Sequence, residues 1–254
     1  MAKVRGLDHF TNYFKGLEDH YVIIGGSAAS VLMEESELIF RATQDIDLVI
    51  LADPSDQVAQ RLLSYVSFGE YKIKEATSNE PRYYRYRDPK SEEFPKMIEI
   101  FSRNAKGLEL NDSQHIIPIE TGSAERLSAI LLDDAYFSLI RTNLYTSEQG
   151  HHVINVMANS CLKARAFCDL TAQKALGAAV DSRDISKHRN DVLKLANALQ
   201  DSSRLLLVDR PKQDLEQAIR AIEELDISQI KAILKDSPVK DSKPLLAQLR
   251  KTFF

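Results

Sequence analysis

The feature that most constrains the fold is a change of pattern along the chain near residue 120. Strand-like runs, either alternating or rich in β-branched residues, occupy 21–24, 45–51, 70–76, 82–88 and 97–101. After residue 120, apolar residues recur at three- and four-residue intervals, and almost no strand pattern remains. We therefore predict an α+β protein, with a mixed sheet flanked by helices in a domain over 1–120 and a helical domain over 121–254.

Helical patterns complete this prediction. In the first domain they cover 7–19, about 27–35 and about 54–65, and residues 108–119 can add one or two strands. In the second domain they cover 123–140, 159–176, 182–199, 211–224, 227–235 and 242–252. Ser27 is a candidate N-cap, and Gly177 is a candidate C-cap of the helix before it.

Composition excludes several classes of protein. The net charge of −4 argues against a dedicated basic nucleic-acid binder, although a local basic groove remains compatible with it. No apolar run approaches the roughly 18 residues that cross a bilayer, and no apolar signal core follows Met1. Cys161 and Cys168 match neither a disulfide framework nor a zinc knuckle, so we predict small buried residues. These features predict a cytoplasmic protein with no membrane partner.

The most informative motif is Asp45-Ile46-Asp47, which leads into an apolar run and follows a turn at Gly25-Gly26-Ser27. On a strand, residues two apart share a face, so the two carboxylates project side by side. Their mutual repulsion is removed by a cation, and hard oxygen ligands suit Mg²⁺ or Mn²⁺ that also holds phosphate. The motif predicts a divalent-metal site beside a turn that can cradle phosphate, although such a motif is also a common strand-end turn.

A third carboxylate, Glu99, lies within the strand-like run Met97–Phe101. A buried glutamate without a partner is unfavourable, so its presence in an apolar strand needs an explanation. If this strand neighbours the one that carries Asp45 and Asp47, Glu99 joins them in a three-carboxylate metal cluster. If it is an edge strand, Glu99 points into water. The sequence leaves both interpretations open.

Together, Gly25-Gly26-Ser27 and Arg41-Ala42-Thr43-Gln44-Asp45-Ile46-Asp47 resemble the first motif of the nucleotidyltransferase superfamily that includes DNA polymerase β. The resemblance is closest to the abortive-infection (AbiEii-like) toxin nucleotidyltransferases. It implies that Gly25, Gly26 and Ser27 hold triphosphate and that Asp45 and Asp47 bind Mg²⁺. It also adds Arg41 and Thr43 to the nucleotide-binding residues.

A second stretch resembles the same toxin branch. Residues 162–170 are similar to its lysine helix, which implies that Lys163 contacts nucleotide phosphates. Residues 182–192 are similar to the basic-then-aspartate motif that follows, which implies a nucleotide-binding role for Lys187 and a catalytic role for Asp191. Lys187 and Asp191 are one helical turn apart and can pair. Lys163 taken alone is equally compatible with a solvated helix residue.

The resemblance implies a Mg²⁺-dependent transfer of a nucleotide monophosphate from an NTP to an acceptor, with a tRNA end or another macromolecule as the acceptor and an antitoxin protein as a partner. In-line attack at phosphorus needs charge stabilised on both the attacking and the leaving oxygen, which metals on shared carboxylates provide. Asp47 would bridge the metals, and Lys163 would neutralise pyrophosphate. Two alternatives remain: an antibiotic-type enzyme that uses a small-molecule acceptor, and a non-catalytic descendant that binds a nucleotide or a partner protein.

Two other segments admit both a functional and a structural interpretation. Residues 81–87 mix tyrosines with arginines, which fits either a surface that stacks bases and pairs phosphates or a half-buried strand with Tyr84 and Tyr86 inward. His151-His152 resembles a metal pair, but adjacent side chains on a strand point apart. We therefore expect no zinc site there.

Overall fold

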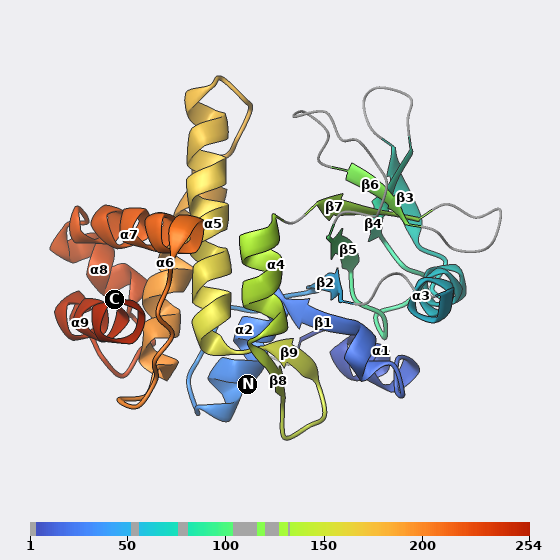
Figure 1. The fold of residues 1–254 in the computed structure, drawn as a ribbon, viewed down its shortest axis with the longest axis horizontal. Coiled ribbons are helices and arrows are strands. Elements are labelled where there is room, and N and C mark those ends of the chain that lie inside the picture. The colour runs from blue at the N-terminus through green and yellow to red at the C-terminus, as the bar shows by residue number, and fades with distance from the viewer. Residues whose placement is uncertain (1–3, 52–55, 76–80, 104–115, 120–126, 132) are drawn as a thin grey trace. The chain divides into compact units, whose positions relative to one another are not determined.

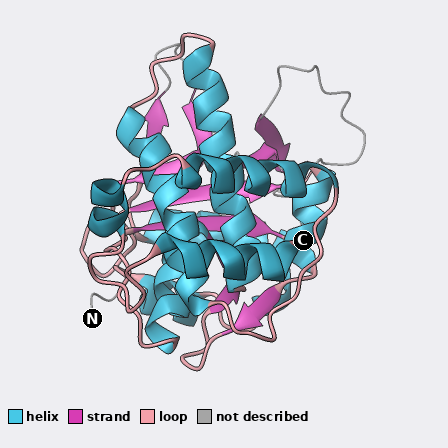
Figure 2. Cartoon of the chain, turned by 90° about the vertical axis from the view of Figure 1, so that its left-hand side faces the viewer, coloured by secondary structure: helices cyan, strands magenta, loops and turns pink. Residues whose placement is uncertain are grey.

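The computed structural model describes residues 4–51, 56–75, 81–103, 116–119, 127–131 and 133–254 (Figure 1). Within these ranges the chain is α+β, as predicted, and combines one mixed sheet with helices (Figure 2). None of the helices in these ranges combines the length and the apolar composition needed to cross a bilayer.

The strands of the described ranges form one sheet. They are β1 (Tyr21–Ile24), β2 (Asp45–Ile50), β3 (Lys72–Glu75), β4 (Pro81–Arg87), β5 (Met97–Ser102), β6 (Ile116–Ile119), β7 (Leu127–Leu131), β8 (Leu144–Thr146) and β9 (His152–Ile154). The order is β3-β4-β5-β2-β1-β9-β8, while β7 pairs with both β5 and β6. Because β2 is antiparallel to β1 and parallel to β5, it is an interior strand with neighbours on both sides.

Helices precede, interrupt and follow the strands. They are α1 (Leu7–Tyr13), α2 (Gly25–Glu35), α3 (Asp56–Phe68), α4 (Asp134–Arg141), α5 (Val156–Ala175), α6 (Ser182–Leu195), α7 (Asp209–Glu223), α8 (Ile227–Ile233) and α9 (Ser242–Phe253), with short 3₁₀ turns at Glu18–His20 and Ala196–Ala198. Asn155 caps α5 by accepting a hydrogen bond from the Ala158 N–H at 3.0 Å. Gly177, with φ of 88°, follows the end of α5 as the sequence predicted.

Two compact units make up the chain. The sheet unit comprises residues up to 31 and residues 41–154, and the helical unit comprises residues 32–40 and 155–254. The boundary therefore differs from the predicted one at residue 120. The reason is that β7, β8 and β9, all after that point, join the sheet; β9 pairs parallel with β1 through Ile23 and Val153.

The predicted helix over 123–140 is wrong for residues 127–131, while residues 123–126 lie outside the described residues. Residues 127–131 form β7, which pairs with β5 and β6, and the helix begins only at Asp134. An apolar run of this length is compatible with either period, and the pairing positions that β5 offers decide in favour of a strand. The N-cap of α4 is Asp133, whose Oδ1 accepts from the Tyr136 N–H at 2.9 Å.

Smaller differences concern the ends of helices. The predicted helix over 7–19 stops at Tyr13, and Gly16 beyond it adopts a positive φ of 88° that the interior of a right-handed helix cannot contain. The helix predicted from about residue 27 begins at Gly25, so Ser27 lies inside it and is not its N-cap. The predicted helix start at Pro54 and the strand pattern over 108–115 lie outside the described residues.

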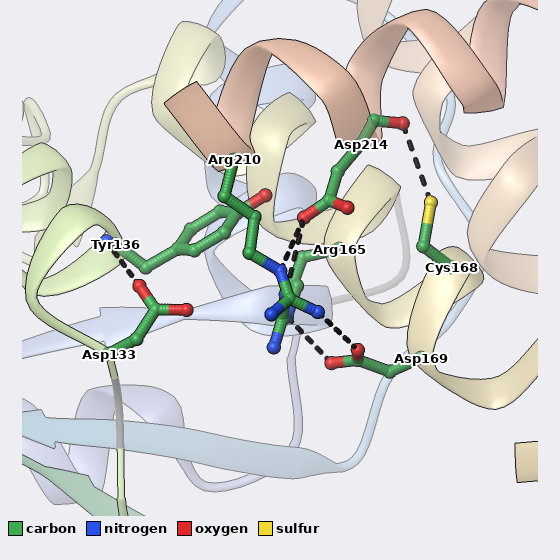
Figure 3. A network of polar contacts seen from close by, with 7 residues as sticks. All are labelled: Asp133, Tyr136, Arg165, Cys168, Asp169, Arg210 and Asp214. Atoms are coloured by element: carbon green, nitrogen blue, oxygen red, sulfur yellow. Dashed lines mark hydrogen bonds and ion pairs between the residues drawn. The ribbon is translucent and has the colours of Figure 1, made fainter. Parts of the chain in front are cut away.

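The helical unit is held together by α5, which contacts both α6 and α7. Figure 3 shows a polar network between α5 and α7, in which the Arg165 guanidinium lies 2.7 Å from Asp169 and 3.4 Å from Asp214. Arg210 of α7 approaches the same two carboxylates at 3.6 and 3.7 Å. Cys161 and Cys168 are free thiols buried in this unit, as predicted.

Candidate functional site

The two aspartates of the predicted metal site project from one face of β2. Asp45 and Asp47 are half-buried, whereas Ile46 and Leu48, on the opposite face, have no exposed surface. This alternation confirms the predicted arrangement, with acidic side chains on one face and apolar side chains on the other. Both carboxylates therefore remain accessible from solvent in part.

Glu99 lies directly beside Asp47 on the neighbouring strand. β5 runs parallel to β2 with Asp47 and Glu99 in register, so the two side chains share a face. On its other side β5 pairs with β4, where Arg85 is in register with Glu99. Because β5 is an interior strand, the interpretation of Glu99 as an edge residue pointing into water is wrong.

The Glu99 carboxylate forms an ion pair with Arg85. The Arg85 Nε donates to Glu99 Oε1 at 2.7 Å, and Arg85 Nη2 donates to the same oxygen. The side chain of Glu99 is only 12% exposed and that of Arg85 is 25% exposed. The partner that makes a glutamate tolerable within this strand is therefore an arginine.

The diglycine turn lies against the Asp47 carboxylate. β1 ends at Ile24, which is in register with Asp47, and Gly25 follows with a φ of 73°. A Cβ atom on Gly25 would overlap Asp47 Oδ2, so any larger residue would force the carboxylate to move. Glycine is thus required here twice, by the left-handed backbone and by the close approach of the carboxylate. The acidic pair and the turn meet, as the sequence predicted.

Three further predicted residues gather around the same turn. A Cβ atom on Gly26 would lie 3.0 Å from Thr43 Oγ1 and 3.4 Å from Arg41 Nη2. The Ser27 hydroxyl donates to the backbone carbonyl of Asp45, which fixes the start of β2 against α2. The start of α2 therefore has a carboxylate on one side and a guanidinium with a hydroxyl on the other.

The carboxylates of Asp45 and Asp47 suit a metal ion that completes its coordination with water and substrate phosphate. Among the residues that the structure describes, no group of three or more His, Cys, Asp and Glu side chains is arranged to hold a metal ion. Glu99 pairs with Arg85 through Oε1, and its place as the third carboxylate of the cluster stays a prediction. Mg²⁺ commonly uses one or two protein carboxylates and fills its octahedron with water and substrate phosphate. Asp45 and Asp47, with the Asp47 carboxylate against Gly25, fit that requirement.

The predicted lysine and aspartate of the helical unit pair with each other. Lys163 Nζ on α5 lies 3.4 Å from Asp191 Oδ2 on α6, and the side chains are only 5% and 2% exposed. The sequence paired Asp191 with Lys187, but Lys187 is exposed and the ion pair shown for Asp191 is with Lys163. Packing of α5 against α6 makes this contact, which the spacing within one helix could not reveal. The nucleotide roles of these three residues stay predictions.

The remaining candidates have structural explanations in the described residues. Tyr86 is buried and faces away from Arg85, as a half-buried strand requires, while the side chains of Tyr83 and Tyr84 lie outside the described residues. The adjacent histidines have different partners, as expected for side chains that point apart. His151 Nδ1 lies 2.9 Å from Thr11 Oγ1, and His152 Nδ1 lies 3.2 Å from Thr146 Oγ1.

Arg85 is the residue of this site that sequence reasoning missed. The mixed tyrosine and arginine pattern of residues 81–87 predicts for it either a phosphate or base contact or a solvated side chain. The available signal was the need of Glu99 for a counter-charge, together with the arginines of the preceding strand. Only the antiparallel register of β4 and β5 shows that Arg85 meets that need.

Comparisons with known proteins add little to this geometry. No family model and no curated protein matches this sequence. Among solved structures, the Megavirus polyadenylate synthase matches with a TM-score of 0.28 and 8% sequence identity, over 98% of this chain and 49% of that one. The chain thus spans about half the length of that protein. A TM-score at this level does not establish a shared fold, so the functional proposal is based on the residues of the site and the motif resemblance.

Proposed function

We propose that this chain is a nucleotidyltransferase that uses Mg²⁺ or Mn²⁺ to move a nucleotide monophosphate from an NTP to an acceptor, with release of pyrophosphate. The observation that carries the proposal is the contact between the Asp47 carboxylate and the diglycine turn at the start of α2. A cation held by the carboxylate and a phosphate held by the turn would then be adjacent, as this chemistry requires.

The candidate site residues of the sheet unit each have a role in this proposal. Asp45 and Asp47 hold the divalent cation, which when bound stabilises negative charge on the phosphoryl oxygens. The N–H groups at the start of α2 point outward along the helix axis and favour the triphosphate. Arg41 and Thr43, which lie against Gly26, supply a positive charge and a hydroxyl to the same phosphates. Ser27 positions the strand through the Asp45 carbonyl.

The finer assignments depend on the motif resemblance. It supports a tRNA end or another RNA as the acceptor and an antitoxin protein as the regulatory partner. It also supports phosphate contacts by Lys163 and Lys187 and a catalytic role for Asp191. The buried Lys163–Asp191 ion pair gives two of these residues a stabilising role that needs no nucleotide, so the decisive variants are those in the sheet unit.

The test is transfer of label from α-³²P NTPs to total RNA in the presence of Mg²⁺ or Mn²⁺. We expect Asp47→Asn to lower transfer at least about 100-fold, because an amide is a poor ligand for a hard cation. Glu70→Gln is the matched control, since it removes a surface carboxylate that pairs with Lys90 at 3.5 Å and should leave transfer unchanged. Transfer by Asp47→Asn at the wild-type rate would show that the assignment is wrong.

The same assay separates the two alternatives. Label that appears in small hydroxylated acceptors, with RNA unlabelled, favours an antibiotic-type enzyme with the same metal site. Tight NTP binding without release of pyrophosphate favours a non-catalytic nucleotide-binding descendant. Because only two aspartates are offered to the cation, Mn²⁺ should bind more tightly when a non-hydrolysable NTP is present.

A further inference from the structure

Three charged side chains stand in register across neighbouring strands at the candidate site. Arg85 of β4 pairs with Glu99 of β5, and Glu99 pairs with Asp47 of β2. Paired residues on adjacent strands share a face and lie roughly 5 Å apart. We call Arg85, Glu99 and Asp47 the charged row. It places a positive, a negative and a negative charge in that order, with the diglycine turn beyond Asp47.

Arg85 binds the middle charge of this row, Glu99, which stands between Arg85 and Asp47. Its Nε and Nη2 both donate to Glu99 Oε1, so two charge-assisted hydrogen bonds converge on one carboxylate oxygen. At 12% and 25% exposure, the two side chains are largely withdrawn from solvent, where screening between charges is weak. Arg85 therefore compensates the negative charge of Glu99, the residue in register with Asp47 on the neighbouring strand.

We propose that Arg85 is a positioning residue that holds Glu99 and sets the negative potential at Asp47, and so sets the divalent-cation affinity of the site. The inference depends on the proposed function, because it requires that Asp45 and Asp47 bind a cation. Glu99 is then the carboxylate beside Asp47 whose charge Arg85 balances.

The two halves of the ion pair should therefore have opposite effects on cation affinity. Removing the positive charge in Arg85→Gln leaves Glu99 uncompensated beside Asp47, and the added negative potential attracts a cation. Removing the negative charge in Glu99→Gln leaves the Arg85 guanidinium two strands from Asp47, where it competes with the cation. We expect affinity for Mn²⁺ to rise about tenfold in the first variant and to fall about tenfold in the second.

The opposite signs distinguish this role from a purely structural one. Both variants break the same ion pair, so a loss of local structure alone would shift cation affinity in the same direction in both. The double variant Arg85→Gln/Glu99→Gln removes both charges and should return the affinity to within about twofold of wild type. Arg85→Lys keeps the positive charge and should stay close to wild type.

The experiment measures Mn²⁺ binding by electron paramagnetic resonance, at fixed pH and ionic strength, with a saturating non-hydrolysable NTP. Lys90→Gln is the matched control, because it removes the cation of the surface ion pair with Glu70 and should leave the affinity unchanged. Circular dichroism and urea unfolding establish that each variant is folded. If Arg85→Gln does not fold, the comparison of Glu99→Gln with Arg85→Lys carries the test, since only the first should weaken binding.

The outcomes separate this inference from the proposed function. Shifts of opposite sign in the single variants support the inference. Shifts of the same sign, or no shift in either, overturn it while the metal site stands, provided that Asp47→Asn has lost Mn²⁺ binding. Wild-type binding of Mn²⁺ by Asp47→Asn would overturn the metal site itself, and the inference with it.

Discussion

The charged row of the sheet unit and the Lys163–Asp191 pair of the helical unit make an instructive contrast. Both consist of opposite charges brought together by packing, and both include residues that the sequence proposed as catalytic. In the sheet unit, Asp45 and Asp47 remain half-exposed and next to a glycine turn. In the helical unit, both partners are almost completely buried and 3.4 Å from each other.

The difference teaches that burial separates two uses of the same residue types. Two neighbouring carboxylates that remain open to solvent repel each other, and this arrangement is stabilised when a cation arrives. A lysine and an aspartate closed off from solvent compensate each other's charge without a bound ligand. We therefore expect the sheet-unit charges to affect ligand binding and the helical-unit charges to affect stability.

The largest expected effect is that of Asp191→Ala. This substitution removes the carboxylate that lies 3.4 Å from the buried Lys163 ammonium, so the free energy of unfolding should fall by about 3–5 kcal/mol in urea unfolding. Glu223→Ala removes one half of an exposed ion pair with Arg250 and should change the free energy of unfolding by less than about 1 kcal/mol. In the sheet unit, Asp47→Asn should also change the free energy of unfolding by less than about 1 kcal/mol. A larger loss from Asp47→Asn than from Asp191→Ala would reverse the comparison.

An intermediate effect is expected from Gly25→Ala, which tests the contact between the turn and the acidic pair. Gly16→Ala is a matched control, because Gly16 also has a positive φ but a Cβ atom added there would meet nothing within 4 Å. The control should lose about 1–2 kcal/mol from the left-handed backbone alone. Gly25→Ala should lose more, because its methyl group must displace the Asp47 carboxylate. Equal losses in the two variants would mean that the close approach at Gly25 is absent.

Mn²⁺ affinity provides a second measurement for the same pair of variants. Gly25→Ala moves a proposed ligand and should weaken binding, whereas Gly16→Ala should leave it unchanged. Unchanged affinity in Gly25→Ala would separate the turn from the cation site and remove the main support for the proposed function.

The smallest effect concerns the pH dependence of stability in the sheet unit. Burial lowers the pKa of His152, although Asp19 and Glu18 oppose this shift. The unfolded chain then binds a proton more readily than the folded chain, so His152 contributes stability above about pH 6.5 that is lost as the pH falls toward the folded-state pKa. Urea unfolding between pH 7.5 and 5 should show a shallower loss for His152→Gln than for wild type. An equal or steeper loss would contradict this assignment.

The sequence predicted the parts of the fold that local patterns determine. The alternation around Asp45 and Asp47 and the helical periodicity after residue 155 were both confirmed, because each depends on the spacing of apolar residues. The helix predicted over 123–140 failed because an apolar run can satisfy either period. Pairing with β5 then decided the structure of residues 127–131.

The candidate site shows the same division between local and long-range information. The sequence identified the acidic pair and the turn, since both are local motifs. It could not show that Glu99 belongs to an interior strand, that Arg85 is its partner, or that Asp191 pairs with Lys163. Each of these contacts joins residues on different elements, and their spacing along the chain carries no information about register or helix packing.

By itself, then, the sequence determined which side chains share a face and where glycine frees the backbone, because periodicity and steric freedom are properties of a short segment. The tertiary structure alone decided which charges are neutralised and which stay open to a ligand. Charge compensation depends on distances between elements, and those distances exist only once strands are in register and helices are packed.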